Sequence, residues 1–111
     1  MKSNEATTLL AALAQETRLE VFRALVRTHS TKIDDGGLAA GDIAALLKVA
    51  PATLSFHLKE LAHAGLVTSR KDGRSIIYKA NLDAMQNLVA YLLEDCCAGA
   101  CDVKMVKMKA M

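Results

Sequence analysis

Aromatic residues are scarce in this sequence. It contains no tryptophan, two tyrosines and two phenylalanines, although 52% of its 111 residues are apolar. The core must therefore consist mainly of aliphatic side chains, which suit packed helices better than a β-sandwich. Because a chain of this length has the ordinary size of one domain, we expect a single, mainly helical domain.

A strong net charge is also lacking. Fourteen lysines and arginines stand against twelve acidic residues, which leaves a formal charge of +2. This charge is too small to indicate nucleic-acid binding by itself, so any DNA-binding surface has to be local. Two basic stretches are present. Residues 70–79 carry four basic side chains and one acid, and residues 103–111 carry three lysines and no acid.

The sequence has no apolar run long enough for a signal peptide or a membrane span. The run from Leu9 to Ala14 is too short for either. We therefore expect a cytoplasmic protein that does not bind membranes. An enzyme is not expected, because no glycine-rich loop is available to hold an oxyanion and the three histidines pair with no plausible nucleophile.

Apolar spacing predicts a short helix, a turn and a longer helix in the middle of the chain. The expected helices span residues 3–14, 17–27, 42–47, 51–64 and 82–95, and the expected strands span residues 66–71 and 74–80. Asp72-Gly73 between the strands favours a two-residue type I′ turn. The fold class that follows is mainly α with a β-hairpin, a winged helix-turn-helix. We assign residues 1–95 to this domain with terminal dimerisation helices, and residues 96–111 to a thiol-bearing C-terminal tail.

These parts suit DNA recognition for simple physical reasons. A single helix fits the major groove and presents side chains to base edges, while cations on a hairpin neutralise phosphates. In the helix over residues 51–64, Leu54, Leu58 and Leu61 share one face, and Phe56 falls on the opposite face with polar neighbours. Phe56 is therefore expected to touch a thymine methyl or a sugar, or alternatively to meet the hairpin.

Three segments make the sequence resemble the ArsR-SmtB family of bacterial repressors. They read LAQETRLEVFRALV, GDIAALLKVAPATLSFHLKELAHAGLV and RKDGRSIIYKAN. The resemblance implies a winged-helix repressor in which Thr53, Ser55 and His57 read bases. The candidate DNA-binding residues are Thr53, Ser55, Phe56, His57, Lys59, Arg70, Lys71 and Arg74. The alternatives are a locally bonded histidine at the edge of the core and a merely solvated hairpin.

Three cysteines lie within six residues of each other near the carboxyl end. In DCCAGACD, small residues separate Cys96 and Cys97 from Cys101, so the chain is able to curl and bring three sulfurs to one ion. Thiols are normally reduced in the cytoplasm, so we interpret these as ligands or redox sensors rather than a structural disulfide. Trivalent arsenic and antimony form pyramidal complexes with three sulfurs, whereas structural zinc normally takes four ligands.

Comparison with the family narrows the sensor site. The helix before the recognition helix lacks the Cys-x-Cys of many arsenic and cadmium sensors, and the last helix lacks the histidine of zinc sensors. YLLEDCC resembles the branch in which a Cys-Cys pair and a following cysteine bind arsenite. The resemblance thus implies As(III) as inducer, with Sb(III) an alternative. Zinc, cadmium and lead remain possible, as do a peroxide sensor and three incidental thiols.

The apolar faces of the first and last expected helices remain once the helix-turn-helix core is built. Recognition of two half-sites normally requires a two-fold dimer, so we expect these faces to form a homodimer interface. The expected interface residues are Leu9, Leu10, Leu13, Met85, Leu88, Val89 and Leu92. The resulting hypothesis is a repressor that arsenic releases from operator DNA of an arsenic-resistance operon. The competing hypothesis is a thiol-based arsenic carrier that binds no DNA.

Overall fold

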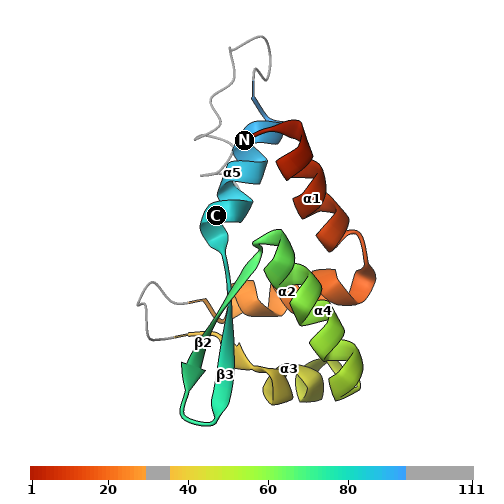
Figure 1. The fold of residues 1–111 in the computed structure, drawn as a ribbon, viewed down its shortest axis with the longest axis vertical. Helices are drawn as coiled ribbons and strands as arrows, with labels where there is room; N and C mark the ends of the chain where they lie inside the picture. The colour runs from red at the N-terminus through yellow and green to blue at the C-terminus, as the bar shows by residue number, and fades with distance from the viewer. Residues whose placement is uncertain (30–35, 95–111) are drawn as a thin grey trace.

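The computed structural model describes residues 1–29 and 36–94. Within these ranges the chain forms five α-helices and a small antiparallel sheet (Figure 1). The elements in chain order are α1 (Ser3–Leu13), α2 (Glu16–Arg27), β1 (Leu38–Ala39), α3 (Ala40–Leu47), α4 (Pro51–Ala64), β2 (Val67–Asp72), β3 (Ser75–Ala80) and α5 (Leu82–Leu92). The predicted fold class, mainly α with a β-hairpin in a winged helix-turn-helix, is confirmed.

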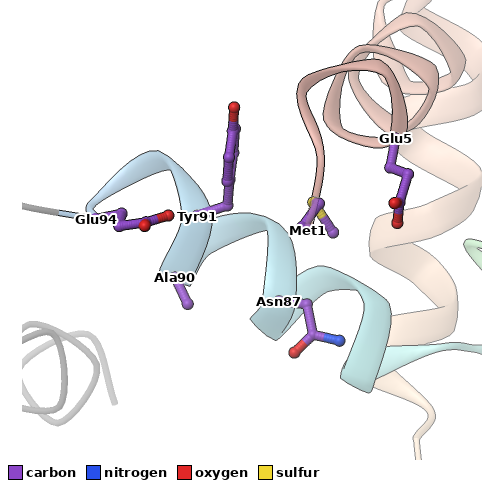
Figure 2. Close-up of a pocket in the computed structure, with 6 residues that line it drawn as sticks. All are labelled: Met1, Glu5, Asn87, Ala90, Tyr91 and Glu94. Carbon is purple, nitrogen blue, oxygen red and sulfur yellow. The ribbon is translucent and has the colours of Figure 1, made fainter.

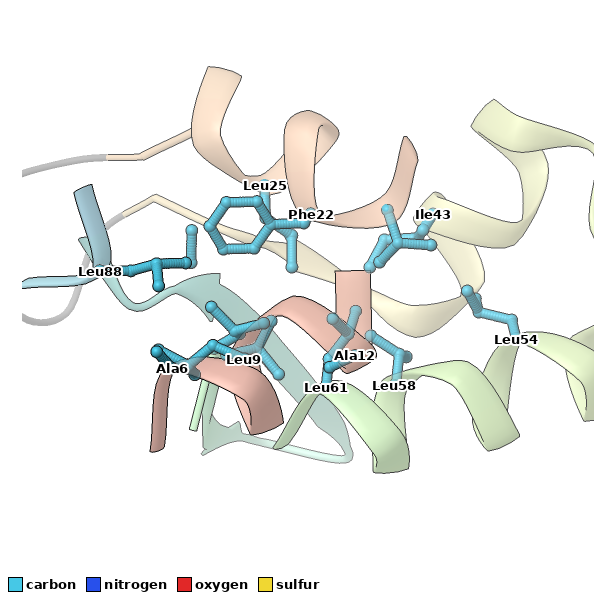
Figure 3. Close-up of a cluster of buried hydrophobic side chains, with 14 residues drawn as sticks. Ala6, Leu9, Ala12, Phe22, Leu25, Ile43, Leu54, Leu58, Leu61 and Leu88 are labelled. Carbon is cyan, nitrogen blue, oxygen red and sulfur yellow. The ribbon is translucent and has the colours of Figure 1, made fainter. Parts of the chain in front are cut away.

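One aliphatic core joins all five helices. Figure 3 shows leucines of α4 facing Phe22 and Leu25 of α2, with Ile43 of α3 at one end of the cluster and Leu88 of α5 at the other. Most of these side chains are almost fully buried, and Phe22 is the one aromatic residue in the buried cluster. An aliphatic core is what the shortage of aromatic residues predicts.

The hairpin of β2 and β3, called the wing below, is anchored to the helices by a third strand. The strand order is β1-β3-β2, with Leu38 opposite Tyr78 and Ala39 opposite Ile77. Sequence periodicity did not predict β1, because two residues are too few to show a period. β1 leads directly into α3, so the wing is tied by backbone hydrogen bonds to the start of the helix-turn-helix.

The turn of the wing lies one residue later than expected. Asp72 pairs with Ser75 as the last rung of the ladder, so the two turn residues are Gly73 and Arg74 rather than Asp72 and Gly73. Only Gly73 has a positive φ, at 63°. Glycine at the first turn position with a negative φ at the second is the pattern of a type II′ turn, not type I′. Arg74 therefore lies at the tip of the wing.

Other boundaries differ from the expectation by a few residues. α5 ends at Leu92 rather than continuing to residue 95, and α3 begins at Ala40, two residues earlier than expected. In residues 1–29 and 36–94, no helix is both long enough and apolar enough to cross a lipid bilayer.

Candidate nucleic-acid interface

The helix-turn-helix is closed by backbone geometry rather than by side-chain caps. Lys48 adopts a left-handed conformation with φ of 57°, and both Lys48 N–H and Val49 N–H donate to the Ala44 carbonyl. Neither α3 nor α4 has a side-chain cap at its N-terminus. Pro51, with its fixed φ, begins α4. The turn thus sets the direction in which α4 leaves α3.

α4 has two distinct faces. Leu54, Leu58 and Leu61 are buried in the core, whereas Thr53, Ser55, Phe56 and Lys59 are exposed. Phe56 is 56% exposed, although the chain has only two phenylalanines and the other, Phe22, is buried. The exposed face carries the donors, acceptors and apolar surface that reading of base edges requires.

His57 does not lie on the exposed face, and this placement corrects the expectation that it reads bases. Its side chain is only 7% exposed, and its ring packs edge-on against Phe56 with centroids 5.6 Å apart. The reason is helical spacing, because position 57 is three residues after Leu54 and four before Leu61 and therefore shares their inward face. His57 thus lies at the edge of the core, and its hydrogen-bond partner is Arg18 of α2 rather than a neighbour in the chain.

The exposed face of α4 adjoins the wing. Ser55, Phe56 and Lys59 line an open hollow of about 460 Å³ together with Ser69 of β2 and Tyr78 of β3. Ser69 and Tyr78 are directly opposite each other in the ladder. In Figure 1 the N-terminal end of α4 and the tip of the wing lie at the same end of the molecule. Side chains of the helix and the hairpin thus share one surface.

The three basic residues predicted on the wing are not equivalent. Lys71 and Arg74 are exposed near the tip. Arg70 is partly buried: its Nη2 donates to the Gly36 carbonyl at 3.1 Å, and its Nη1 is buried without a hydrogen-bond partner. Successive residues of a strand point to opposite faces, so Arg70 points away from the face that carries Ser69 and Lys71. The predicted role of Arg70 as a DNA-binding cation is therefore less favoured than that of Lys71 and Arg74, because its guanidinium is engaged within the protomer.

Arg18 in α2 is a supporting residue that sequence reasoning missed. Its Nε donates to the Ala12 carbonyl at the end of α1 at 2.7 Å, and its Nη1 lies 3.4 Å from Nδ1 of His57. Its backbone N–H donates to Oε1 of Gln15, which caps α2. Arg18 thus links its own helix, α2, to α1 and α4, and no periodicity in the sequence marks such a contact.

Asn81 is a second supporting residue that sequence reasoning missed. It follows β3 and bonds to the residues just before β2, so it holds together the ends of the two wing strands. Its Nδ2 donates to the Gly65 carbonyl at 2.9 Å, and its Oδ1 accepts from Ala84 N–H and so caps α5. Its backbone N–H also donates to the Leu66 carbonyl at 2.8 Å. An asparagine directly before an apolar helix is a capping signal that could have been used.

The predicted dimer residues divide into buried and exposed sets. Leu9 and Leu88 are buried within the protomer's own core, at 6% and 2% exposure, so they offer little surface to a partner. Leu10 and Leu92 are 42% and 55% exposed. The remaining three, Leu13, Met85 and Val89, are partly buried. Of the predicted set, Leu10 and Leu92 therefore offer the most apolar surface.

α1 and α5 are joined at the end of the molecule away from the wing tip. Ser3 Oγ and the Tyr91 hydroxyl lie 2.7 Å apart, a hydrogen bond between the two helices. Figure 2 shows Met1 and Glu5 of the α1 end facing Tyr91 and Glu94 across an open hollow of about 460 Å³. Ser3 is the first residue of α1, which has no side-chain cap at its N-terminus.

The predicted thiol site lies outside the described residues. Cys96, Cys97 and Cys101 all follow residue 94. Among the described residues, no group of three histidine, aspartate or glutamate side chains is arranged to hold a metal ion.

Known proteins similar to this chain are regulators of transcription. A family model described as a helix-turn-helix domain matches residues 13–70. The arsenical resistance operon repressor of Staphylococcus aureus is 32% identical over 92 residues, which cover 83% of this chain and 81% of the repressor. The transcriptional activator HlyU of Vibrio cholerae is 29% identical over 90 residues, covering 81% of this chain and 76% of the activator.

Two solved structures extend the comparison. An ArsR-like transcriptional regulator from Rhodococcus sp. RHA1 superposes with a TM-score of 0.71 at 31% identity, covering 96% of this chain and 92% of the regulator. A homodimeric winged helix-turn-helix DNA-binding domain from Mycobacterium bovis has a TM-score of 0.64 at 23% identity and covers 81% and 77% of the two chains. These relatives are DNA-binding regulators rather than enzymes. The chain described here belongs to the ArsR family of winged helix-turn-helix transcriptional regulators.

Proposed function

We propose that this protein is a homodimeric repressor that binds double-stranded operator DNA and releases it when trivalent arsenic binds Cys96, Cys97 and Cys101, with antimony as an alternative inducer. The observation that carries DNA binding is the shared surface of the exposed α4 face and the wing. The arsenic part is supported by the three thiols and by the arsenical resistance repressor among the relatives.

On the DNA, α4 reads bases and the wing holds phosphates. Thr53, Ser55 and Lys59 offer hydroxyl and ammonium groups to base edges, and the exposed ring of Phe56 suits a thymine methyl. Lys71 and Arg74 neutralise phosphates beside the groove. Arg70 and His57 are left out of this contact set, since both are engaged inside the protomer.

The proposed inducer is a soft ion that binds thiolates. Thiolates are soft ligands, and three of them complete the pyramidal coordination of As(III) or Sb(III). Because Cys96 follows the end of α5 by only a few residues in the sequence, we propose that ion binding acts through this helix of the proposed dimer interface. An ion that weakens DNA binding is bound less tightly by the DNA complex, with couplings of about 1–3 kcal/mol typical of such linkage.

The test measures which chemical signal releases DNA. A labelled fragment of the protein's own promoter is titrated with protein, and arsenite, antimonite, zinc, cadmium and peroxide are then added separately. We expect arsenite and antimonite to release the fragment. Release by zinc, cadmium or peroxide alone would identify a repressor with another signal. Absence of any DNA binding would favour the thiol-based carrier, and increased transcription on binding would indicate an activator.

The three thiols are tested one at a time. Each of Cys96→Ser, Cys97→Ser and Cys101→Ser is expected to keep operator binding and lose release by arsenite, because a hydroxyl is a hard and mostly protonated ligand. Met105→Leu is the matched control, since it removes a sulfur from the same tail without removing a thiol. If only Cys101→Ser is silent, the site uses two thiols. If all three variants still release DNA, arsenite acts elsewhere.

A further inference from the structure

Arg18 joins the recognition helix to the first helix through one side chain. Its Nε donates to the carbonyl of Ala12, one of the last carbonyls of α1, and its Nη1 contacts Nδ1 of His57 in the middle of α4. The guanidinium has donors only, so in this hydrogen bond Nη1 of Arg18 donates and Nδ1 of His57 accepts. Two helices are thus linked through a rigid, planar fork.

The space between α1 and α4 beside the Arg18 side chain is not filled by apolar side chains of the described residues. A hollow of about 480 Å³ that Arg18 borders has alanines at its centre and polar side chains around them; it is lined by Thr8, Ala11 and Ala12 of α1 and by Glu60, His63 and Ala64 of α4. Small side chains do not interlock as leucines do, so they restrict the angle between two helices less. Leu9 and Ala12 of α1 share the buried core with the leucines of α4, and beside that packing the arginine fork adds a polar link between the two helices.

We propose that Arg18 and His57 are positioning residues that set the spacing between the two DNA half-sites. The inference rests on the proposed homodimer, in which α1 contributes to the two-fold interface. If α1 is fixed across the two-fold axis, the angle between α1 and α4 decides how far apart the two recognition helices lie. One base pair shifts a half-site by about 3.4 Å and turns it by about 35°, so a small change in that angle changes the preferred spacing.

This role differs from base reading in what it leaves unchanged. A residue that reads bases changes the preference among base pairs within a half-site. A residue that sets the angle of α4 changes the preference among spacings and leaves the preference among base pairs intact. His57, which is buried and touches Arg18, is placed for the second role.

The experiment measures both preferences for each variant. A random DNA pool is first selected with wild-type full-length protein to obtain two half-sites, and probes are then made with one or two base pairs added or removed at the centre. We expect the wild type to lose roughly tenfold or more in affinity at a changed spacing. In Arg18→Lys and His57→Phe this ratio should fall to roughly threefold or less, because an ammonium does not span both acceptors and a phenyl ring accepts nothing.

Matched variants separate the two roles. Ser55→Ala, on the exposed face, is expected to lose discrimination between half-site sequences and keep the wild-type spacing ratio. His57→Asn keeps an acceptor near the position of Nδ1 and is expected to recover part of that ratio. Lys2→Ala, a charge change directly before α1 and away from this contact, is expected to match the wild type in both measurements.

Several results would overturn the proposal. Wild-type spacing ratios in both Arg18→Lys and His57→Phe would do so, as would a loss of base discrimination in His57→Phe without a change in spacing preference. Circular dichroism and sedimentation confirm that each variant is a folded dimer, and if His57→Phe does not fold, Arg18→Lys decides. Selection of a single half-site by the wild type would instead mean that the proposed dimeric function fails, and the inference with it.

Discussion

Glycine is required at position 37 for two separate reasons. Its φ is 88°, a left-handed value that residues with a Cβ rarely adopt, and a Cβ built there would lie 2.5 Å from the Tyr78 carbonyl oxygen. Gly37 N–H also donates to the Thr28 carbonyl at 3.1 Å. The close approach allows β1 to begin beside β3, so this residue fixes how the wing attaches to the helices.

Gly37→Ala is therefore expected to lower the free energy of unfolding by about 2 kcal/mol or more, from backbone strain and the clash together. Gly41→Ala is the matched control, because Gly41 lies in α3 and its added Cβ meets nothing within 4 Å. That control should gain about 0.5–1 kcal/mol through helix propensity. Urea unfolding measures both, and equal stabilities of the two variants would contradict the close approach.

At the scale of elements, Asn81 holds α5 to the end of α4. Asn81→Ala removes both the α5 cap and the bond to the Gly65 carbonyl, and we expect a loss of about 2 kcal/mol in the free energy of unfolding. Asn81→Ser retains a capping oxygen and is too short to reach Gly65, so it should recover about 1 kcal/mol. Thermal and urea unfolding test this order. If Asn81→Ser is no more stable than Asn81→Ala, the side-chain cap of α5 does not contribute to stability.

The wing is tested through salt dependence. Arg74→Ala and Lys71→Ala should each weaken binding to all DNA sequences alike and reduce the slope of log affinity against log salt by about 0.9. Lys2→Ala, far from the wing tip, should leave the slope unchanged. Arg70→Ala should lower stability with little effect on the slope, because its guanidinium binds Gly36. A reduction of the slope by about 0.9 in Arg70→Ala would instead show that Arg70 contacts a phosphate.

The elements were largely predictable from sequence because long helices repeat their apolar pattern over several turns. β1 was not, since its two residues pair with β3, more than 35 residues later, and nothing local encodes that pairing. The predicted turn of the wing was wrong by one residue. Asp72-Gly73 and Gly73-Arg74 both contain a glycine that can adopt a positive φ, and only the strand register decides which pair forms the turn. The burial of His57 could have been predicted, because His57 follows Leu54 by three residues and so shares its face of the helix. The family resemblance instead favoured a base-reading role.

For the whole molecule, the central expectation is assembly through α1 and α5. Leu92 is 55% exposed on α5, so Leu92→Asp places a charge on the proposed apolar interface and should give monomers that no longer bind operator DNA. Leu46→Asp is the matched control: Leu46 is 59% exposed on α3, at the other end of the molecule, and the variant should stay dimeric. Sedimentation measures both. A stable dimer of Leu92→Asp would exclude this interface.

The two faces of α4 have an evolutionary consequence. Substitutions at Thr53, Ser55 or Phe56 change the proposed DNA-binding surface without disturbing the core leucines behind them. After gene duplication, a copy of this protein can therefore acquire a new target sequence by single substitutions while it keeps its fold, the proposed dimer surface and the proposed sensor tail. Regulators built on this helix can diversify the genes they control faster than the signals to which they respond.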